Sequence, residues 1–129
     1  MLLIEHYVDK SPIHGLGVFS SVWVKANTKI YEFDPLIDIV IKKEALNELP
    51  LHVQQRIQMR AEFYEDAGVF ILGADGDSFM NHSDDPNLFN IGRETYALRD
   101  IEPGEELTCD YRSIVVITFD VTESKVNKG

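Results

Sequence analysis

Cysteine is nearly absent from this chain of 129 residues, in which Cys109 is the only one. A disulfide within the chain is therefore excluded, and so is a zinc site built from several cysteines. Basic residues are also scarce, because 12 Lys and Arg stand against 22 Asp and Glu and give a net charge of -10. This balance argues against direct binding of DNA or RNA, which needs positive charge to displace counterions. It suits a basic partner protein instead.

Long apolar runs are missing as well. No stretch approaches the roughly 18 consecutive apolar residues that indicate a membrane-spanning helix, so we expect no membrane association. The start of the chain lacks the basic segment and the long apolar stretch of a signal peptide, and we expect a cytoplasmic protein where it is made. With 44% apolar residues the chain can bury a core, and its length suits one domain.

Short apolar segments separated by turn residues predict many strands. We expect strands over 2–8, from Val18, and over 30–33, 36–41, 69–72, 105–111 and 114–121, with a hairpin of 87–91 and 95–99. Apolar residues recur every three or four positions over 44–64, which predicts an amphipathic helical insert in which Met59 and Phe63 are core residues. Pro50 either starts a second helix there or kinks the first. Together these patterns predict a β-rich α+β domain over 1–121 and a polar tail over 122–129.

Residues 79–87, with the sequence FMNHSDDPN, are rich in hydrogen-bonding side chains. Pro86 prevents a regular helix or central strand there, and the Asn and Asp residues favour tight turns. Phe79 and Met80 are the apolar residues that would anchor this segment to the core. The segment is therefore either a functional loop or a solvated turn, and its composition alone leaves both interpretations open.

Other familiar chemistries fit poorly. Gly15 and Gly17 could bring the backbone close to a ligand, but the third glycine of the dinucleotide fingerprint is absent and a strand follows in place of a helix. The acidic cluster of 75–85 lacks the spacing of a calcium loop, and its only histidine, His82, has no second histidine at zinc-ligand spacing. We therefore predict no metal site. Tyr111, at the end of an alternating strand, either presents its hydroxyl to a pocket or packs in the core.

Three segments, taken in order, resemble the SET domain of protein lysine methyltransferases. SPIHGLGVF at 11–19 resembles the N-terminal glycine motif of that family, and 79–83 with Pro86 and Asn87 resembles its central Asn-His-Ser motif. The run from Arg99 to Tyr111 resembles its C-terminal motif. Three motifs in the right order are far more specific than any one of them.

The resemblance implies a fold of small β-sheets with a threaded C-terminal segment, and S-adenosylmethionine as methyl donor. By position, the segment of Gly15, Leu16 and Gly17 would contact the cofactor, together with Asn81 and His82. The acceptor would be a lysine of a histone or another basic protein. If the substrate is a histone, we expect the protein to act in a nucleus, either that of the cell that makes it or that of a host cell.

Two tyrosines are assigned to the lysine channel by the same resemblance. Tyr111 would be the catalytic tyrosine at the mouth shared by methyl group and lysine, whereas Tyr64 is a second channel tyrosine that no motif fixes. The chain departs from the family in several ways, since it has no cysteine-rich module, it has Arg112 where a glycine is frequent, and Leu16 replaces a bulky aromatic. Residues 41–72 match no family pattern, and the resemblance therefore predicts no particular target lysine.

Two alternatives remain from the sequence. The first is a non-catalytic SET-like module that binds a protein partner, and the second is a cation-binding protein built on the acidic cluster of 75–85. The apolar strand expected over 114–121 would also favour a homodimer, because an exposed strand invites pairing with another chain.

Overall fold

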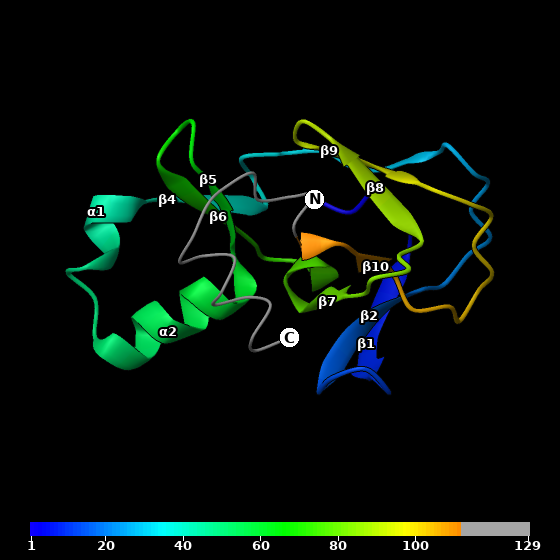
Figure 1. Ribbon diagram of the computed structural model, residues 1–129, viewed down its shortest axis with the longest axis horizontal. Coiled ribbons are helices and arrows are strands. Elements are labelled where there is room, and N and C mark those ends of the chain that lie inside the picture. Colours follow the sequence, from blue (N-terminus) through cyan, green and yellow to red (C-terminus); the bar gives the residue numbers. More distant parts are fainter. Residues whose placement is uncertain (112–129) are drawn as a thin grey trace.

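The structure is a computed structural model, and it describes residues 1–111. The strand expected over 114–121 and the tail of 122–129 lie outside the described residues. Figure 1 shows two groups of elements side by side, with the helices and one sheet in the first group and the remaining small sheets in the second. This is the β-rich α+β architecture with a helical insert that the sequence predicts.

The chain begins with a β-hairpin. Strand β1 (His6–Lys10) pairs antiparallel with β2 (Leu16–Ser20), and the register brings Asp9 opposite Gly17. Strand β1 is almost entirely exposed, whereas three of the five residues of β2 are buried. The expected strand over 2–8 is therefore wrong in its bounds. Leu2 forms only an isolated bridge to Tyr31, and its side chain is buried in the core.

A three-stranded sheet carries the predicted hairpin. Its order is β3 (Lys29–Tyr31), β9 (Glu94–Ala97) and β8 (Leu88–Ile91), all antiparallel. Strands β8 and β9 are joined by Gly92 and Arg93, and the φ of Gly92 is +62°, a conformation that suits glycine in such a tight turn. The hairpin expected from the sequence is confirmed here.

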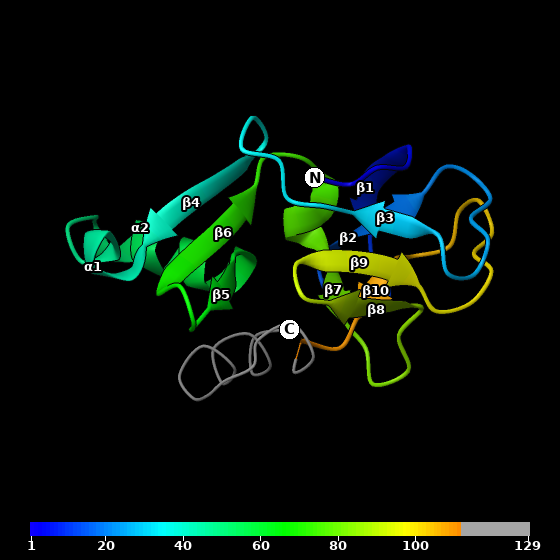
Figure 2. The same ribbon diagram turned by 90° about the horizontal axis from the view of Figure 1, so that it is seen from above.

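The helical insert forms the other group with its own sheet. Strand β6 (Val69–Gly73) lies between β4 (Asp38–Lys42) and β5 (Glu62–Tyr64), and helices α1 (Lys43–Leu46) and α2 (Leu51–Arg60) lie beside this sheet in Figure 2. Pro50 precedes the first residue of α2, so it starts a second helix. Neither helix has the length and apolar character needed to cross a membrane within the described part of the chain.

The predicted helix over 44–64 ends too late. Ala61 has extended backbone angles, and residues Glu62–Tyr64 form β5 in place of a last helical turn. In a short segment, apolar spacing of three to four residues does not distinguish a helical turn from a strand. The aromatic ring of Phe63 packs instead against Phe70 across the strand pair, with 4.9 Å between ring centroids.

The C-terminal segment is threaded between two earlier strands. Strand β10 (Thr108–Cys109) pairs in parallel with β7 (Asn81–His82), which follows the short 3-10 helix η1 (Gly76–Phe79). On its other side, Glu106 forms a bridge with Phe19 of β2. Only Thr108 and Cys109 are strand, so the alternating strand expected over 105–111 is too long. This crossing brings the three sequence motifs together.

Two apolar cores support these groups. The first lies under the small sheets and contains nine buried residues: Leu2, Val18, Val24, Ile30, Tyr31, Leu88, Ala97, Ile101 and Leu107. The second lies between the insert helices and their sheet and contains Leu46, Ile57, Ala61, Phe63 and Phe70. Phe63 is a core residue, as predicted, but Met59 is not, because it is 42% exposed. The last turn of α2 turns Met59 away from the second core.

Candidate functional site

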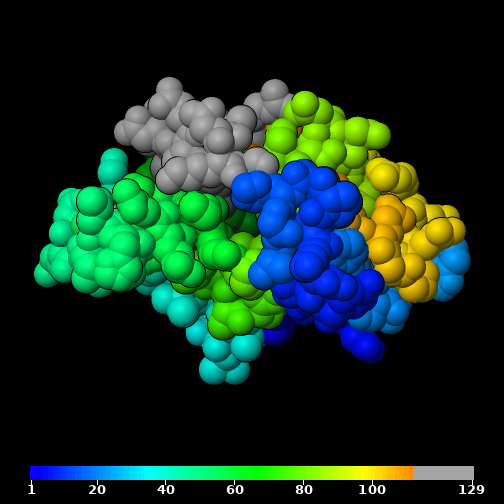
Figure 3. Space-filling model, turned by 90° about the horizontal axis from the view of Figure 1, so that it is seen from below, coloured from blue at the N-terminus to red at the C-terminus, as the bar shows by residue number. Residues whose placement is uncertain are grey.

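A pocket opens where the two groups of elements meet. It has a volume of about 110 Å³. It is lined by residues of the glycine motif, the end of α2, the segment of η1 and β7, and the segment that follows β10, namely His14, Gly15, Leu16, Met59, Arg60, Ser78, Phe79, Met80, Asn81 and Tyr111. In the space-filling view, α2 and the β1–β2 hairpin face each other across a hollow (Figure 3). The pocket thus combines all three motifs with one side of the insert.

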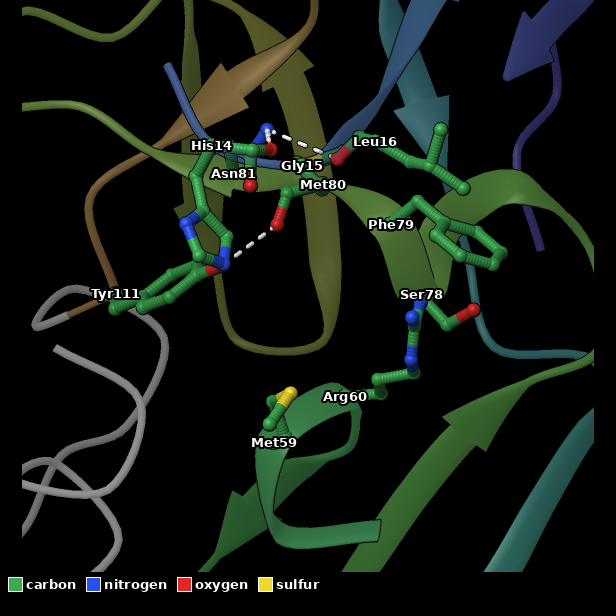
Figure 4. Close-up of a pocket in the computed structure, with 10 residues that line it drawn as sticks. All are labelled: His14, Gly15, Leu16, Met59, Arg60, Ser78, Phe79, Met80, Asn81 and Tyr111. Carbon is green, nitrogen blue, oxygen red and sulfur yellow. Dashed lines mark hydrogen bonds between the residues drawn. The ribbon is translucent and has the colours of Figure 1, made fainter. Parts of the chain in front are cut away.

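The glycine motif forms a turn that Asn81 holds in place. Gly15 has a φ of +48°, which side chains with a Cβ rarely adopt, and its Cβ position faces open space. The Asn81 amide nitrogen donates toward the carbonyl oxygens of His14 and Leu16, each at 3.1 Å. Figure 4 shows this turn and Asn81 on one wall of the pocket. The turn is therefore preformed, with its backbone close to the pocket.

Glu106 is a third member of this arrangement that the sequence did not single out. One of its carboxylate oxygens accepts from the Asn81 amide at 2.9 Å, and both accept from the Ser11 hydroxyl at 2.8 and 2.9 Å. The amide nitrogen of Asn81 has two hydrogens and three acceptors, so one hydrogen is shared. A Cβ on Gly17 would lie 2.3 Å from this carboxylate, which explains the need for glycine there. Gly17 itself does not line the pocket. Its lack of a side chain allows the Glu106 carboxylate to lie close to the backbone at this position.

Tyr111 lies at the other end of the pocket. The residue is 9% exposed, and its hydroxyl donates to the main-chain carbonyl of Met80 at 2.7 Å. Burial raises the pKa of Tyr111 well above the ordinary value for tyrosine. The hydroxyl therefore stays protonated at neutral pH and can act as a hydrogen-bonding group at the edge of the pocket (Figure 4).

His82 contacts Tyr111 but does not line the pocket. Its Nδ1 atom accepts a hydrogen bond from the backbone N–H of Tyr111 at 3.1 Å, and its Nε2 atom lies 2.9 Å from Asp84 Oδ1. In the neutral ring the hydrogen must therefore sit on Nε2 and be donated to Asp84. The parallel pairing of β7 with β10 produces this contact, since it places His82 beside Cys109, two residues before Tyr111.

Two residues of α2 line the pocket, and no motif in the sequence predicts this position for them. Met59 and Arg60 end a helix whose apolar stripe predicts only a core-facing surface. The guanidinium carbon of Arg60 lies 4.1 Å from the centroid of the Phe79 ring. A charged side chain at the end of an amphipathic helix is ordinarily solvated, so only the tertiary arrangement identifies it.

Tyr64 lies apart from this pocket, since it is not among the described residues that line it. Its hydroxyl donates to Glu62 at 2.7 Å, and the guanidinium carbon of Arg93 lies 4.6 Å from its ring centroid. The structure thus brings together Gly15, Leu16, Asn81 and Tyr111 of the predicted site residues and places Gly17 and His82 directly behind them. It does not bring Tyr64 to the same pocket.

The acidic segment after β6 is used for backbone contacts. Asp75 accepts from the backbone N–H groups of Leu2, at 2.8 Å, and Asp77, at 3.2 Å. No three His, Cys, Asp or Glu side chains of residues 1–111 lie together in a way that could hold a metal ion.

Comparisons with known proteins agree with the three motifs. The sequence model of the SET domain matches residues 15–112. Histone-lysine N-methyltransferase TRX1 of Oryza sativa subsp. japonica is 32% identical over 118 residues, which are 81% of this chain. The chain spans only 11% of the length of that rice protein.

Solved structures give the same answer for the fold. A Plasmodium falciparum protein proposed to be a histone methyltransferase superposes with a TM-score of 0.57 and 26% identity, over 85% of this chain and 95% of that one. A humanized mutant of the Chaetomium thermophilum Polycomb Repressive Complex 2, bound to the inhibitor GSK126, superposes with a TM-score of 0.65 and 18% identity, over 93% of this chain and 16% of that one. At that identity the second likeness concerns the fold alone. With its matching motifs, its threaded C-terminal segment and these relatives, the chain belongs to the SET domain family.

Proposed function

We propose that this protein is a protein-lysine N-methyltransferase that uses S-adenosylmethionine as methyl donor. The observation that carries the proposal is the meeting of the preformed glycine turn, held by Asn81, with the Tyr111 hydroxyl in one pocket. The family membership and the rice relative support the same reaction. The proposal places the donor against the glycine turn and the acceptor lysine near Tyr111.

The residues present fit such a donor. Exposed backbone at Gly15 and the polar side chain of Asn81 suit the polar parts of a nucleoside and an amino acid, while Leu16, Met80 and Phe79 offer apolar surface. When bound, S-adenosylmethionine supplies an electrophilic methyl group on a sulfonium. Among residues 1–111, no Asp or Glu lines the pocket, so none of these carboxylates competes there with the lysine amine for that methyl group.

The protein's own contribution is orientation and desolvation. An acceptor lysine must be neutral to react, and an apolar pocket lowers a lysine pKa by disfavouring the charged form. The protonated Tyr111 hydroxyl and the Met80 carbonyl, 2.7 Å apart, form a polar group at one end of the pocket and can direct the amine. Placing two reactants in line within such a site can supply much of the rate enhancement.

A basic protein is the substrate class that the charge of the chain favours. The net charge of -10 would attract a segment rich in Lys and Arg. Attraction between exposed charges is screened over a distance of about 8 Å at physiological salt. The apparent KM for a basic peptide should therefore rise with salt concentration, and a flat response would show that the acidic surface plays no part in capture.

The direct test of the function is incubation with isotopically labelled S-adenosylmethionine and a panel of basic proteins, followed by mass spectrometry of lysine residues. The proposal predicts label on lysine. A non-catalytic SET-like module would bind a protein from the panel without transferring label. Thermal unfolding with S-adenosylhomocysteine checks the donor site independently, because a ligand at one hundred times its Kd adds about 2.7 kcal/mol of stability.

A further inference from the structure

Arg60 is the one Lys or Arg among the described residues that line the pocket. It is the last residue of α2, and its half-buried guanidinium lies over the Phe79 ring. Figure 4 shows the guanidinium reaching toward Ser78 and Phe79, across the pocket from the glycine turn. The flat face of the guanidinium is occupied by the ring, while its N–H edge remains available for a planar partner.

The charge of Arg60 has no anionic partner in the described part of the chain. The ion pairs of residues 1–111 involve Lys29, Arg93, Arg99, His82 and the N-terminal amine, and none involves Arg60. Burial and the neighbouring charge of Arg56 lower the pKa of Arg60. Although the chain has far more acidic than basic residues, no ion pair within residues 1–111 compensates this cation at the pocket. A partly buried charge of this kind is stabilised when an anion pairs with it.

Resting on the proposed function, we infer that Arg60 binds the carboxylate of the amino-acid part of the methyl donor. The guanidinium fork matches a carboxylate in a bidentate way, which a single ammonium cannot do. Leu16, Phe79 and Arg60 lie toward one end of the pocket, and Tyr111 lies toward the other (Figure 4). A donor that presents its methyl group near Tyr111 directs either its adenosyl part or its amino-acid part to the other end. The cationic side chain of Arg60 favours the amino-acid part there, because that part carries the carboxylate. Residue 60 thereby gives the helical insert a role in donor binding.

Calorimetric titration with two ligands that differ only in the carboxylate tests this assignment. The ligands are S-adenosylmethionine and its decarboxylated form, measured on the wild type and on Arg60→Gln. We expect Arg60→Gln to weaken the binding of S-adenosylmethionine about 10- to 100-fold, the range of a charge-assisted hydrogen-bonded pair. The same variant should change the affinity for the decarboxylated ligand less than about threefold. Arg60→Lys keeps the charge and loses the guanidinium fork, so its affinity for S-adenosylmethionine should lie between those of the wild type and Arg60→Gln.

Arg56→Gln is the matched control, because Arg56 is an exposed arginine one turn earlier on α2 and is not among the lining residues. It should change both affinities far less than Arg60→Gln changes the affinity for S-adenosylmethionine, although the charge of Arg56 acts on Arg60. Equal weakening of both ligands by Arg60→Gln, in a variant with wild-type melting temperature, would assign Arg60 to packing on Phe79 and overturn the inference. Unchanged binding of S-adenosylmethionine by Arg60→Gln would overturn it as well. Failure of the wild type to bind either ligand would overturn the proposed function itself, and this inference with it.

Discussion

The backbone N–H of Tyr111 donates to Nδ1 of His82 at 3.1 Å, and the Tyr111 hydroxyl donates to the carbonyl of Met80 at 2.7 Å. The same residue is thus held at its backbone by β7 and at its side chain by the residue before β7. Asp84 keeps the His82 ring in the tautomer whose Nδ1 can accept. His82 is therefore a positioning residue for Tyr111.

His82→Ala should reduce turnover while leaving the fold intact. Without the imidazole ring, the backbone N–H of Tyr111 loses its hydrogen bond to Nδ1, and the Tyr111 ring loses the packing of the His82 ring against it. A misplacement of about 1 Å is enough to slow a reaction that depends on orientation. We expect kcat to fall roughly tenfold or more with little change in KM for the donor. Initial rates and melting temperatures would be measured for His82→Ala and for His52→Ala, an exposed histidine on α2. Equal rates in the two variants would contradict this role.

Gly17 and Glu106 should be energetically coupled. A methyl group at Gly17 would lie 2.3 Å from Glu106 Oε2 and 3.0 Å from Ser11 Cβ, so Gly17→Ala alone should cost about 1–3 kcal/mol through overpacking. Glu106→Ala alone leaves the Ser11 hydroxyl and the Asn81 amide without this acceptor and should cost about 1–3 kcal/mol. In the double variant the methyl group occupies the vacated space. The double variant should therefore lose less stability than the sum of the losses of the two single variants. Urea denaturation of all four proteins measures this, and strict additivity would show that the contact is not the reason for the glycine.

Alkaline solution should destabilise the fold through its buried tyrosines. Burial, followed by the charges of Asp77 and Glu62, raises the pKa of Tyr31 in the folded state above the ordinary value of about 10. Below that pH both states are protonated and the contribution to stability is complete. Above it the unfolded chain loses the proton first, and stability falls by up to about 1.4 kcal/mol per pH unit for each such tyrosine until the folded pKa is reached.

Tyr31→Phe removes one of these groups and should make the decline less steep by up to that amount. Denaturation midpoints and slopes at several values from about pH 9 to pH 11 would show the difference. If stability declines with pH equally steeply in the wild type and in Tyr31→Phe, the phenol of Tyr31 ionises as easily in the folded protein as in the unfolded chain.

Much of the candidate site was predictable because its members belong to three local motifs. Gly15, Leu16, Asn81 and Tyr111 each sit in a segment whose residues specify a turn, a short strand or a strand end, and their order along the chain identifies the fold that brings them together. The tight hairpin at Gly92 was predictable for the same reason, since the turn residue and the flanking apolar residues agree.

Arg60 and Glu106 could not be assigned in this way. The environment of Arg60 depends on how α2 docks beside η1, and nothing in the helix sequence records that arrangement. Glu106 reaches Ser11 and Asn81, residues 95 and 25 positions away, only because the chain threads between β2 and β7. The end of α2 at Ala61 was also missed, because the pairing of β5 with β6 decides it and the apolar spacing does not.

The central claim is that Tyr111 takes part in methyl transfer, and Tyr111→Phe tests it most directly because the variant removes one oxygen and keeps the ring. Initial rate, donor affinity and melting temperature would be measured together on the variant and the wild type. The account predicts a loss of turnover on the order of 100-fold or more with donor affinity retained, as for removal of a positioned catalytic donor. A variant that melts lower, by an amount corresponding to a lost buried hydrogen bond of about 1 kcal/mol, and yet methylates lysine at the wild-type rate would contradict it.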